Sequence, residues 1–177
     1  MAARADVDDL LAKMRVERAR LIDAARSVPE DRLAVRPPDA QGEDGWSVLE
    51  QLSHLLEMER AYDAWVRACV ERDSPDLSRV RPDAAPIPLE RAHDHSREQL
   101  VDALVRERER TEALIGSLDV ADFDRVGTHP MFGSLTVLQW LRSFYRHDRM
   151  HQAQIEGREP DYRPRYAGGR EPDQRRR

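Results

Sequence analysis

The most constraining feature of this sequence is a stretch near its C-terminal end, residues 136–155, which predicts an amphipathic helix. One face of that helix carries side chains at steps of three and four: Val137, Trp140, Phe144, His147, His151 and Gln154. His147 and His151 therefore continue an apolar stripe that should point into a core. A buried imidazole needs a polar partner because its ring nitrogens lose water. Two imidazoles one turn apart can reach a single ion, so this spacing indicates a metal site.

Three further helices are predicted upstream of this stretch. Apolar residues recur at helical period over residues 7–26, 48–72 and 89–117. The second of these segments begins with a capping box, in which a serine is followed three residues later by a glutamate. The fourth helix begins in the same way, with a threonine and a glutamine, and a glycine at position 157 ends it.

The connecting segments complete the predicted architecture. Residues 73–88 contain four prolines and predict a crossover loop, and residues 119–134 also predict a loop. Since no convincing alternating strand pattern is present, we expect an all-α four-helix bundle formed by residues 1–157. Residues 158–177 have no apolar period and carry seven arginines, so they predict a basic, disordered tail.

Composition narrows the function classes. A net charge of −5 argues against generic nucleic-acid binding, and the arginine-rich tail has too few interleaved aromatics to change that interpretation. No apolar run approaches the length of a membrane span and no signal segment is evident, so cytoplasmic residence is the default expectation. The single cysteine, Cys69, excludes an intramolecular disulfide and lies in a setting that favours packing over nucleophilic catalysis.

A third candidate ligand comes from the second helix. His54 lies on an apolar stripe with Met58, Ala61 and Trp65, away from the solvated face of that helix. Inward-facing side chains on facing helices of a bundle can converge on one ion. Three neutral imidazoles would leave a coordination position for water or substrate, which is the arrangement of a catalytic site.

These residues resemble a known family. The pattern consists of two separated signatures in order: Gly45-Trp46-Ser47-Val48 leading to His54, then Thr128-His129-Pro130, Phe132-Gly133, His147-Asp148 and His151 with Gln154-Ile155. It is similar to the DinB-like superfamily, whose relatives include the YfiT-type bacillithiol transferases and the mycothiol-dependent maleylpyruvate isomerases. The resemblance covers roughly residues 7–156.

The resemblance implies a four-helix bundle that holds a divalent ion, often zinc or nickel, through His54, His147 and His151. It also implies a homodimer and a low-molecular-weight thiol such as mycothiol or bacillithiol, which attacks a small-molecule electrophile. The leading hypothesis is therefore a metal-dependent thiol S-transferase, because a divalent ion stabilises a thiolate near neutral pH. Two alternatives stay open: a hydrolase that uses metal-bound water, and a non-catalytic metal-binding stress or interaction protein.

Other polar residues receive less specific interpretations. Asp148 is expected to pair with a neighbouring helix rather than to support a ligand, because it faces roughly 100° away from His147. His129 fits either the mouth of the site or a structural role in its loop. His93 is expected to be a satisfied core histidine, and residues 106–110 a solvated charge run.

Overall fold

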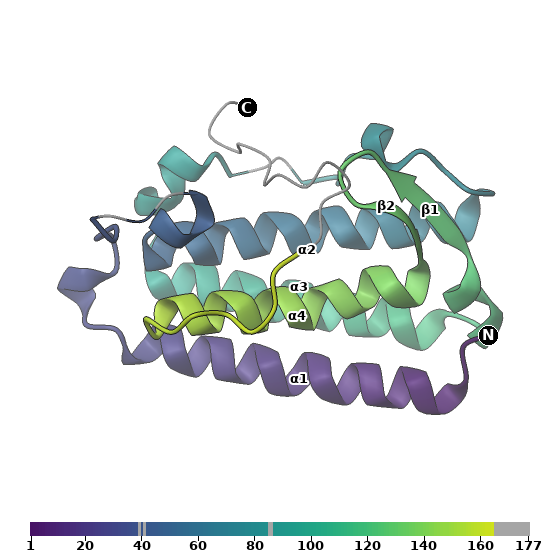
Figure 1. Cartoon of the computed structure of the whole chain (residues 1–177), viewed down its shortest axis with the longest axis horizontal. Coiled ribbons are helices and arrows are strands. Elements are labelled where there is room, and N and C mark those ends of the chain that lie inside the picture. The colour runs from purple at the N-terminus through teal and green to yellow at the C-terminus, as the bar shows by residue number, and fades with distance from the viewer. Residues whose placement is uncertain (39, 41, 85–86, 165–177) are drawn as a thin grey trace.

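The computed structural model describes residues 1–38, 40, 42–84 and 87–164. Its four long helices are α1 (Arg4–Ser27), α2 (Val48–Glu71), α3 (Arg97–Ser117) and α4 (Val137–Ile155). Figure 1 shows that α1 and α4 run in one direction and α2 and α3 in the other. The proline-rich connection between α2 and α3 therefore returns along the length of the bundle. The predicted all-α four-helix bundle with a crossover loop is confirmed.

The predicted helix ends of α2 and α4 are also confirmed. The Ser47 hydroxyl accepts from the backbone of Glu50, and Thr136 makes the same capping box with Gln139. Gly157 follows α4 with φ of +69°, a conformation that glycine adopts without steric cost. The backbone N–H of Arg158 then donates to the carbonyl of Ala153 at 2.8 Å, which ends the helix.

The predicted third helix was wrong at its beginning. Residues Leu89–Asp94 form a short 3-10 helix, η4, and His95 is extended with φ of −112° and ψ of 144°. The α-helix starts only after Ser96, whose hydroxyl accepts from the backbone of Gln99. The capping box at Ser96 thus separates two helical segments whose apolar residues share one period in the sequence.

A β-hairpin occupies part of the segment predicted to be a loop. Strands β1 (Val126–His129) and β2 (Gly133–Thr136) pair antiparallel before α4. At Gly127 a Cβ atom would lie 2.5 Å from the Cys69 sulfur, so only glycine allows β1 to approach α2 this closely. In the described part of the connections lie four other 3-10 helices: η1 (Glu30–Arg32), η2 (Gly42–Gly45), η3 (Leu77–Arg79) and η5 (Val120–Asp124).

An ionic layer lies between two apolar clusters of the core. One cluster gathers the N-terminal part of α1, the C-terminal parts of α2 and α3 and the beginning of α4, and the other gathers the opposite ends of α1, α2 and α3. Each long helix contributes one residue to the layer, which consists of Arg18, Glu59, Arg108 and Asp148. The expected ion pair of Asp148 is confirmed. The predicted solvated run 106–110 was wrong at Arg108, which is buried.

The layer is densely hydrogen-bonded. The Asp148 carboxylate accepts from Arg18 Nε at 3.0 Å and from Arg108 Nη2 at 2.9 Å. The Glu59 carboxylate accepts from Arg108 Nε at 2.7 Å and from the Thr111 hydroxyl at 3.1 Å, and it also pairs with Arg18. Two guanidinium groups therefore balance two carboxylates inside the bundle.

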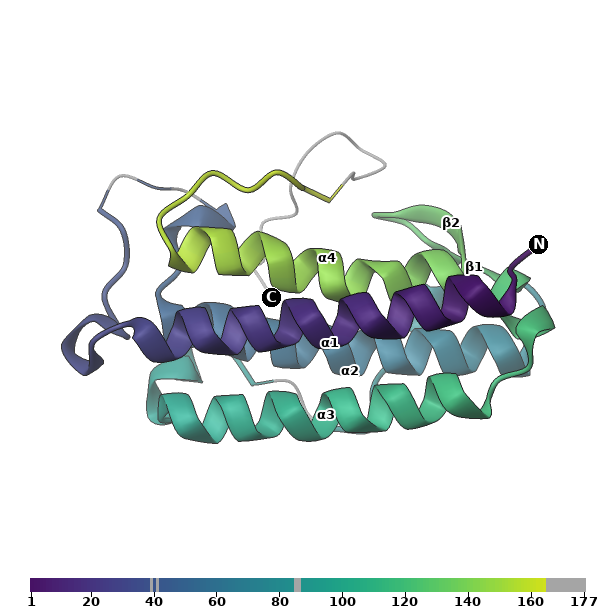
Figure 2. The same cartoon turned by 90° about the horizontal axis from the view of Figure 1, so that it is seen from below.

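The segment after α4 turns back along the outside of that helix (Figure 2). Within residues 158–164, Asp161 pairs with Arg149. The Cζ atom of the Arg146 guanidinium lies over the Tyr162 ring, 5.7 Å from the centre of that ring. The remainder of the predicted tail, residues 165–177, lies outside the described residues. No helix among the described residues is long and apolar enough to cross a membrane.

Candidate metal centre

The three predicted histidines meet inside the bundle. His54 comes from the beginning of α2, and His147 and His151 come from the end of α4, which runs antiparallel to α2. The Nε2 atom of His147 lies 3.2 Å from that of His54 and 3.0 Å from that of His151. All three side chains are buried. The helical period thus brings these imidazoles to one point, as the sequence predicted.

The spacing of the nitrogens suits a shared ion. Nitrogen ligands about 2.0–2.1 Å from a tetrahedral ion are roughly 3.3 Å apart. A network of hydrogen bonds explains the spacing less well, because each neutral imidazole carries only one N–H. A single N–H at His147 could serve one of its two neighbours, whereas an ion would serve all three nitrogens.

Gln51 orients His151. The Gln51 side-chain N–H donates to the backbone carbonyl of Trp46 at 3.1 Å, which turns its Oε1 toward His151. That oxygen lies 3.2 Å from Nδ1 of His151 and therefore accepts a hydrogen bond from the Nδ1–H group. The Nε2 lone pair of His151 then points at the other two histidines. Support of this kind fixes the tautomer of a metal-binding histidine.

Burial keeps the three imidazoles neutral. It lowers the pKa of His54 well below the ordinary value, and the nearby His147 adds to the effect. Burial also lowers the pKa of His151, with contributions from His147 and His54. For His147, burial outweighs the attraction of Asp148 and lowers the pKa to about 4. All three are therefore unprotonated near pH 7, as metal ligands must be.

Glu43 is a fourth member of the cluster that the sequence did not predict. One of its carboxylate oxygens lies 3.7 Å from Nε2 of His54, and the side chain is buried. One ligand atom each from Glu43, His54, His147 and His151 can be chosen so that all four lie within 4.8 Å of one another. Glu43 belongs to η2, in a connection without apolar period, so no sequence pattern marked it. The donor set of three imidazoles and a carboxylate fits a divalent ion.

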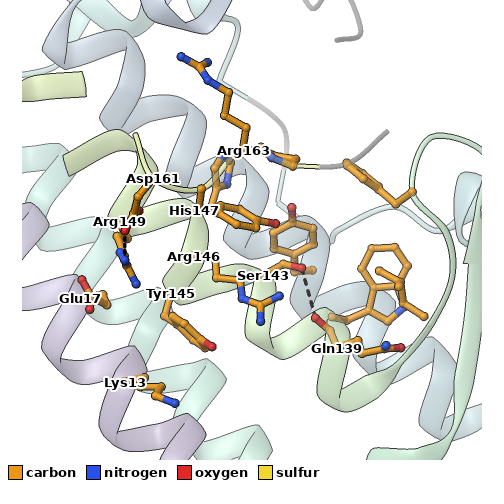
Figure 3. Close-up of a pocket in the computed structure, with 16 residues that line it drawn as sticks. Lys13, Glu17, Gln139, Ser143, Tyr145, Arg146, His147, Arg149, Asp161 and Arg163 are labelled. Carbon is orange, nitrogen blue, oxygen red and sulfur yellow. Dashed lines mark hydrogen bonds and ion pairs between the residues drawn. The ribbon is translucent and has the colours of Figure 1, made fainter. Parts of the chain in front are cut away.

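A pocket of about 930 Å³ reaches the cluster at His147 (Figure 3). Tyr62, Phe132 and Trp140 supply aromatic walls. Its basic side chains outnumber its acidic ones: Lys13, Arg146, Arg149 and Arg163 against Glu17 and Asp161. The volume lies in the range of small-molecule sites.

The remaining candidates lie apart from the three histidines. His129 packs against Trp65, with 4.7 Å between ring centres, and its Nδ1 accepts from the backbone of Met131 at 3.2 Å. These contacts fit a structural role in the hairpin. His93 is exposed and its Nε2 lies 3.0 Å from the Ser47 hydroxyl, so its prediction as a core histidine was wrong. Burial raises the pKa of the Cys69 thiol to about 11, against a weaker effect of Arg125.

Solved structures with the same fold were found by comparison. YfiT from Bacillus subtilis, inferred to be a metal-dependent hydrolase with an unusual four-helix bundle topology, superposes with a TM-score of 0.72 at 17% identity, over 89% of this chain and 87% of YfiT. TT2238, a four-helix bundle protein, superposes with a TM-score of 0.61 at 20% identity, over 84% of this chain and 96% of TT2238. A variant of mycothiol-dependent maleylpyruvate isomerase gives a TM-score of 0.62 at 10% identity, over 84% of this chain and 60% of the isomerase.

The chain also matches known proteins at the level of amino-acid sequence. The uncharacterised protein YuaE from Bacillus subtilis is 36% identical over an alignment of 123 residues, and the match covers 62% of this chain and 75% of YuaE. The sequence model of the DinB superfamily matches residues 14–155, which include all three histidines and most of the four helices. The chain belongs to the DinB superfamily.

Proposed function

We propose that the chain is a divalent-metal-dependent enzyme that transfers a low-molecular-weight thiol to a small-molecule electrophile. His54, His147 and His151 would hold the ion, with zinc or nickel as the preferred metals because imidazole suits both. The observation that carries the proposal is the convergence of the three Nε2 atoms, 3.0 and 3.2 Å apart, beside a pocket. When bound, the ion would stabilise the thiolate form of the incoming thiol.

The residues around the cluster have separate tasks in this proposal. Gln51 holds His151 in the tautomer whose Nε2 can bind an ion. The pocket next to His147 offers aromatic walls for the electrophile, at Tyr62 and Trp140. Burial of the cluster limits the access of water.

The thiol would come from outside the chain. Cys69 is the one cysteine of the sequence, it is buried, and its high pKa leaves almost none of it as thiolate near pH 7. Mycothiol and bacillithiol are the proposed donors, and the isomerase that shares this fold is described as mycothiol-dependent.

The test combines metal analysis with a conjugation assay. Protein purified without added metal or chelator should contain close to one divalent ion per chain. It should consume mycothiol or bacillithiol in the presence of a model electrophile, and chelation should stop that reaction. The His147→Ala variant should hold no ion. A wild-type protein that neither contains nor takes up a divalent ion would sink the proposal.

Hydrolysis is the second candidate, favoured by the fold shared with YfiT, which was inferred to be a metal-dependent hydrolase. The same ion would lower the pKa of a bound water. Turnover of a model ester or amide with no thiol present would favour this reaction. Metal binding without either reaction would favour the non-catalytic binding protein. The homodimer stays a prediction, which the mass in solution would test.

A further inference from the structure

We propose that Glu43 is the fourth protein ligand of the ion held by His54, His147 and His151. This inference rests on the metal site of the proposed function and adds a residue to it. It would change the site from three imidazoles to three imidazoles and a carboxylate.

The position of the Glu43 oxygen supports this assignment. At 3.7 Å from Nε2 of His54, it is too far for a hydrogen bond between the two side chains. The separation is close to the roughly 3.3 Å expected between two ligands of one tetrahedral ion. With the Nε2 separations of 3.0 and 3.2 Å, three of the distances in the cluster fit coordination of a common ion.

Contacts of the loop hold Glu43 over the cluster. The neighbouring Asp44 accepts a hydrogen bond from the side-chain N–H of Gln154 at 2.6 Å, which ties η2 to the end of α4. Three residues after Glu43, Trp46 packs its ring edge-on against His54, with 4.8 Å between ring centres. The backbone N–H of Trp46 also donates to the carbonyl of Glu43 at 3.2 Å. Glu43 is thus held in place by its neighbours Asp44 and Trp46, which contact α4 and α2 respectively.

Charge favours the same assignment. The three imidazoles are neutral and leave the full double charge of the ion uncompensated. A buried carboxylate beside the ion would halve that charge and would itself gain a cationic neighbour. Since Glu43 comes from a short loop segment and the histidines come from long helices, Glu43 is the ligand that a substrate could replace with the least movement of the bundle.

The experiment measures metal binding without any activity assay. Affinity for Zn²⁺ is determined by competition with a chromophoric chelator for the wild type, Glu43→Gln and Glu30→Gln. Glu30→Gln is the matched control, because it makes the same substitution in the same connection at an exposed carboxylate that pairs with Arg97. We expect Glu43→Gln to weaken Zn²⁺ binding at least about tenfold and Glu30→Gln to leave it unchanged.

A spectroscopic measurement covers the case of a misfolded variant. X-ray absorption of the Zn²⁺-loaded wild type should show three imidazoles and one additional protein oxygen, and Glu43→Gln should lose that oxygen. Unchanged affinity and an unchanged spectrum in Glu43→Gln would overturn the assignment and leave the three-histidine site intact. Absence of Zn²⁺ binding in the wild type would overturn this assignment together with the proposed function.

Discussion

Two buried polar clusters adjoin on α4, and they meet the cost of burial in different ways. In the ionic layer, Asp148 and Glu59 are balanced by Arg18 and Arg108, so the groups satisfy one another. In the histidine cluster next to it, the Nε2 atom of His147 lies 3.2 Å from that of His54 and 3.0 Å from that of His151.

Burial and polarity alone therefore do not mark a functional site. In the ionic layer the charges are balanced by side chains of the chain itself. The three imidazoles instead bring like groups together, and an ion held between them would satisfy all three Nε2 atoms. Substitutions in each cluster and the addition of a metal distinguish the two.

Breaking the ionic layer should destabilise the protein most. Arg108→Met leaves two buried carboxylates facing a single guanidinium, which should cost roughly 3–5 kcal/mol of unfolding free energy. Urea denaturation followed by circular dichroism measures this change. The control is Arg106→Met, in the same charged run but exposed, which should change the free energy by no more than about 0.5 kcal/mol. Equal effects of the two substitutions would show that the layer contributes no special stability.

Adding a metal should stabilise the wild type and not a variant of the histidine cluster. Zn²⁺ at about 100 times its dissociation constant should raise the unfolding free energy by about 2.7 kcal/mol, because it binds only the folded state. In His147→Ala the same addition should have no effect on thermal unfolding. A shift of Tm that is the same in both proteins would place the ion elsewhere.

Removing the support of His151 should weaken metal binding without abolishing it. Gln51→Leu deletes the oxygen that accepts from Nδ1 and should lower Zn²⁺ affinity about 10- to 100-fold. Gln51→Glu keeps an acceptor at that place and should restore most of the affinity. Gln152→Leu serves as the control, since that side chain contacts Glu156 and faces away from the cluster. If Gln51→Leu bound Zn²⁺ as the wild type does, the hydrogen bond would have no role in the site.

Changes at Cys69 should have the smallest effect on the proposed reaction. With a pKa raised to about 11, only about one thousandth of this thiol is ionised at pH 8. Alkylation of the folded protein by iodoacetamide should therefore be slow at pH 8 and rise as the pH approaches 11. Cys69→Ala should retain thiol-dependent turnover. Rapid alkylation at pH 8, or loss of turnover in Cys69→Ala, would make Cys69 a candidate nucleophile.

Local patterns predicted the parts of the fold and of the site that lie on α2 and α4. Capping boxes at Ser47 and Thr136 fix where these helices begin, because the side chains involved are three residues apart in the chain. Helical period then places His54 on one inward face and His147 with His151 on another. The same rules misplaced the beginning of α3, where a capping box at Ser96 interrupts a continuous apolar period.

Other buried polar residues are not predicted by any local sequence pattern. Arg18 interrupts an apolar stripe and Arg108 lies in a charged run, so both resemble solvated residues in the sequence. The burial of Arg18 depends on Asp148, which is 130 residues away along the chain, and the burial of Arg108 depends on Glu59, which is 49 residues away. Glu43 lies in a connection without periodic pattern, and its approach to His54 depends on the path of the loop.

Local sequence patterns are sufficient to locate the four helices, apart from the beginning of α3, together with the inward faces of α2 and α4 and the three histidines on those faces. Packing of the helices is what selects the buried polar groups that compensate one another and the groups that could bind an ion. The two kinds of information differ because the interactions behind them act over different distances along the chain. Helix period and capping act within about four residues, whereas a balanced ion pair or a ligand set is made by side chains that meet only when distant helices pack.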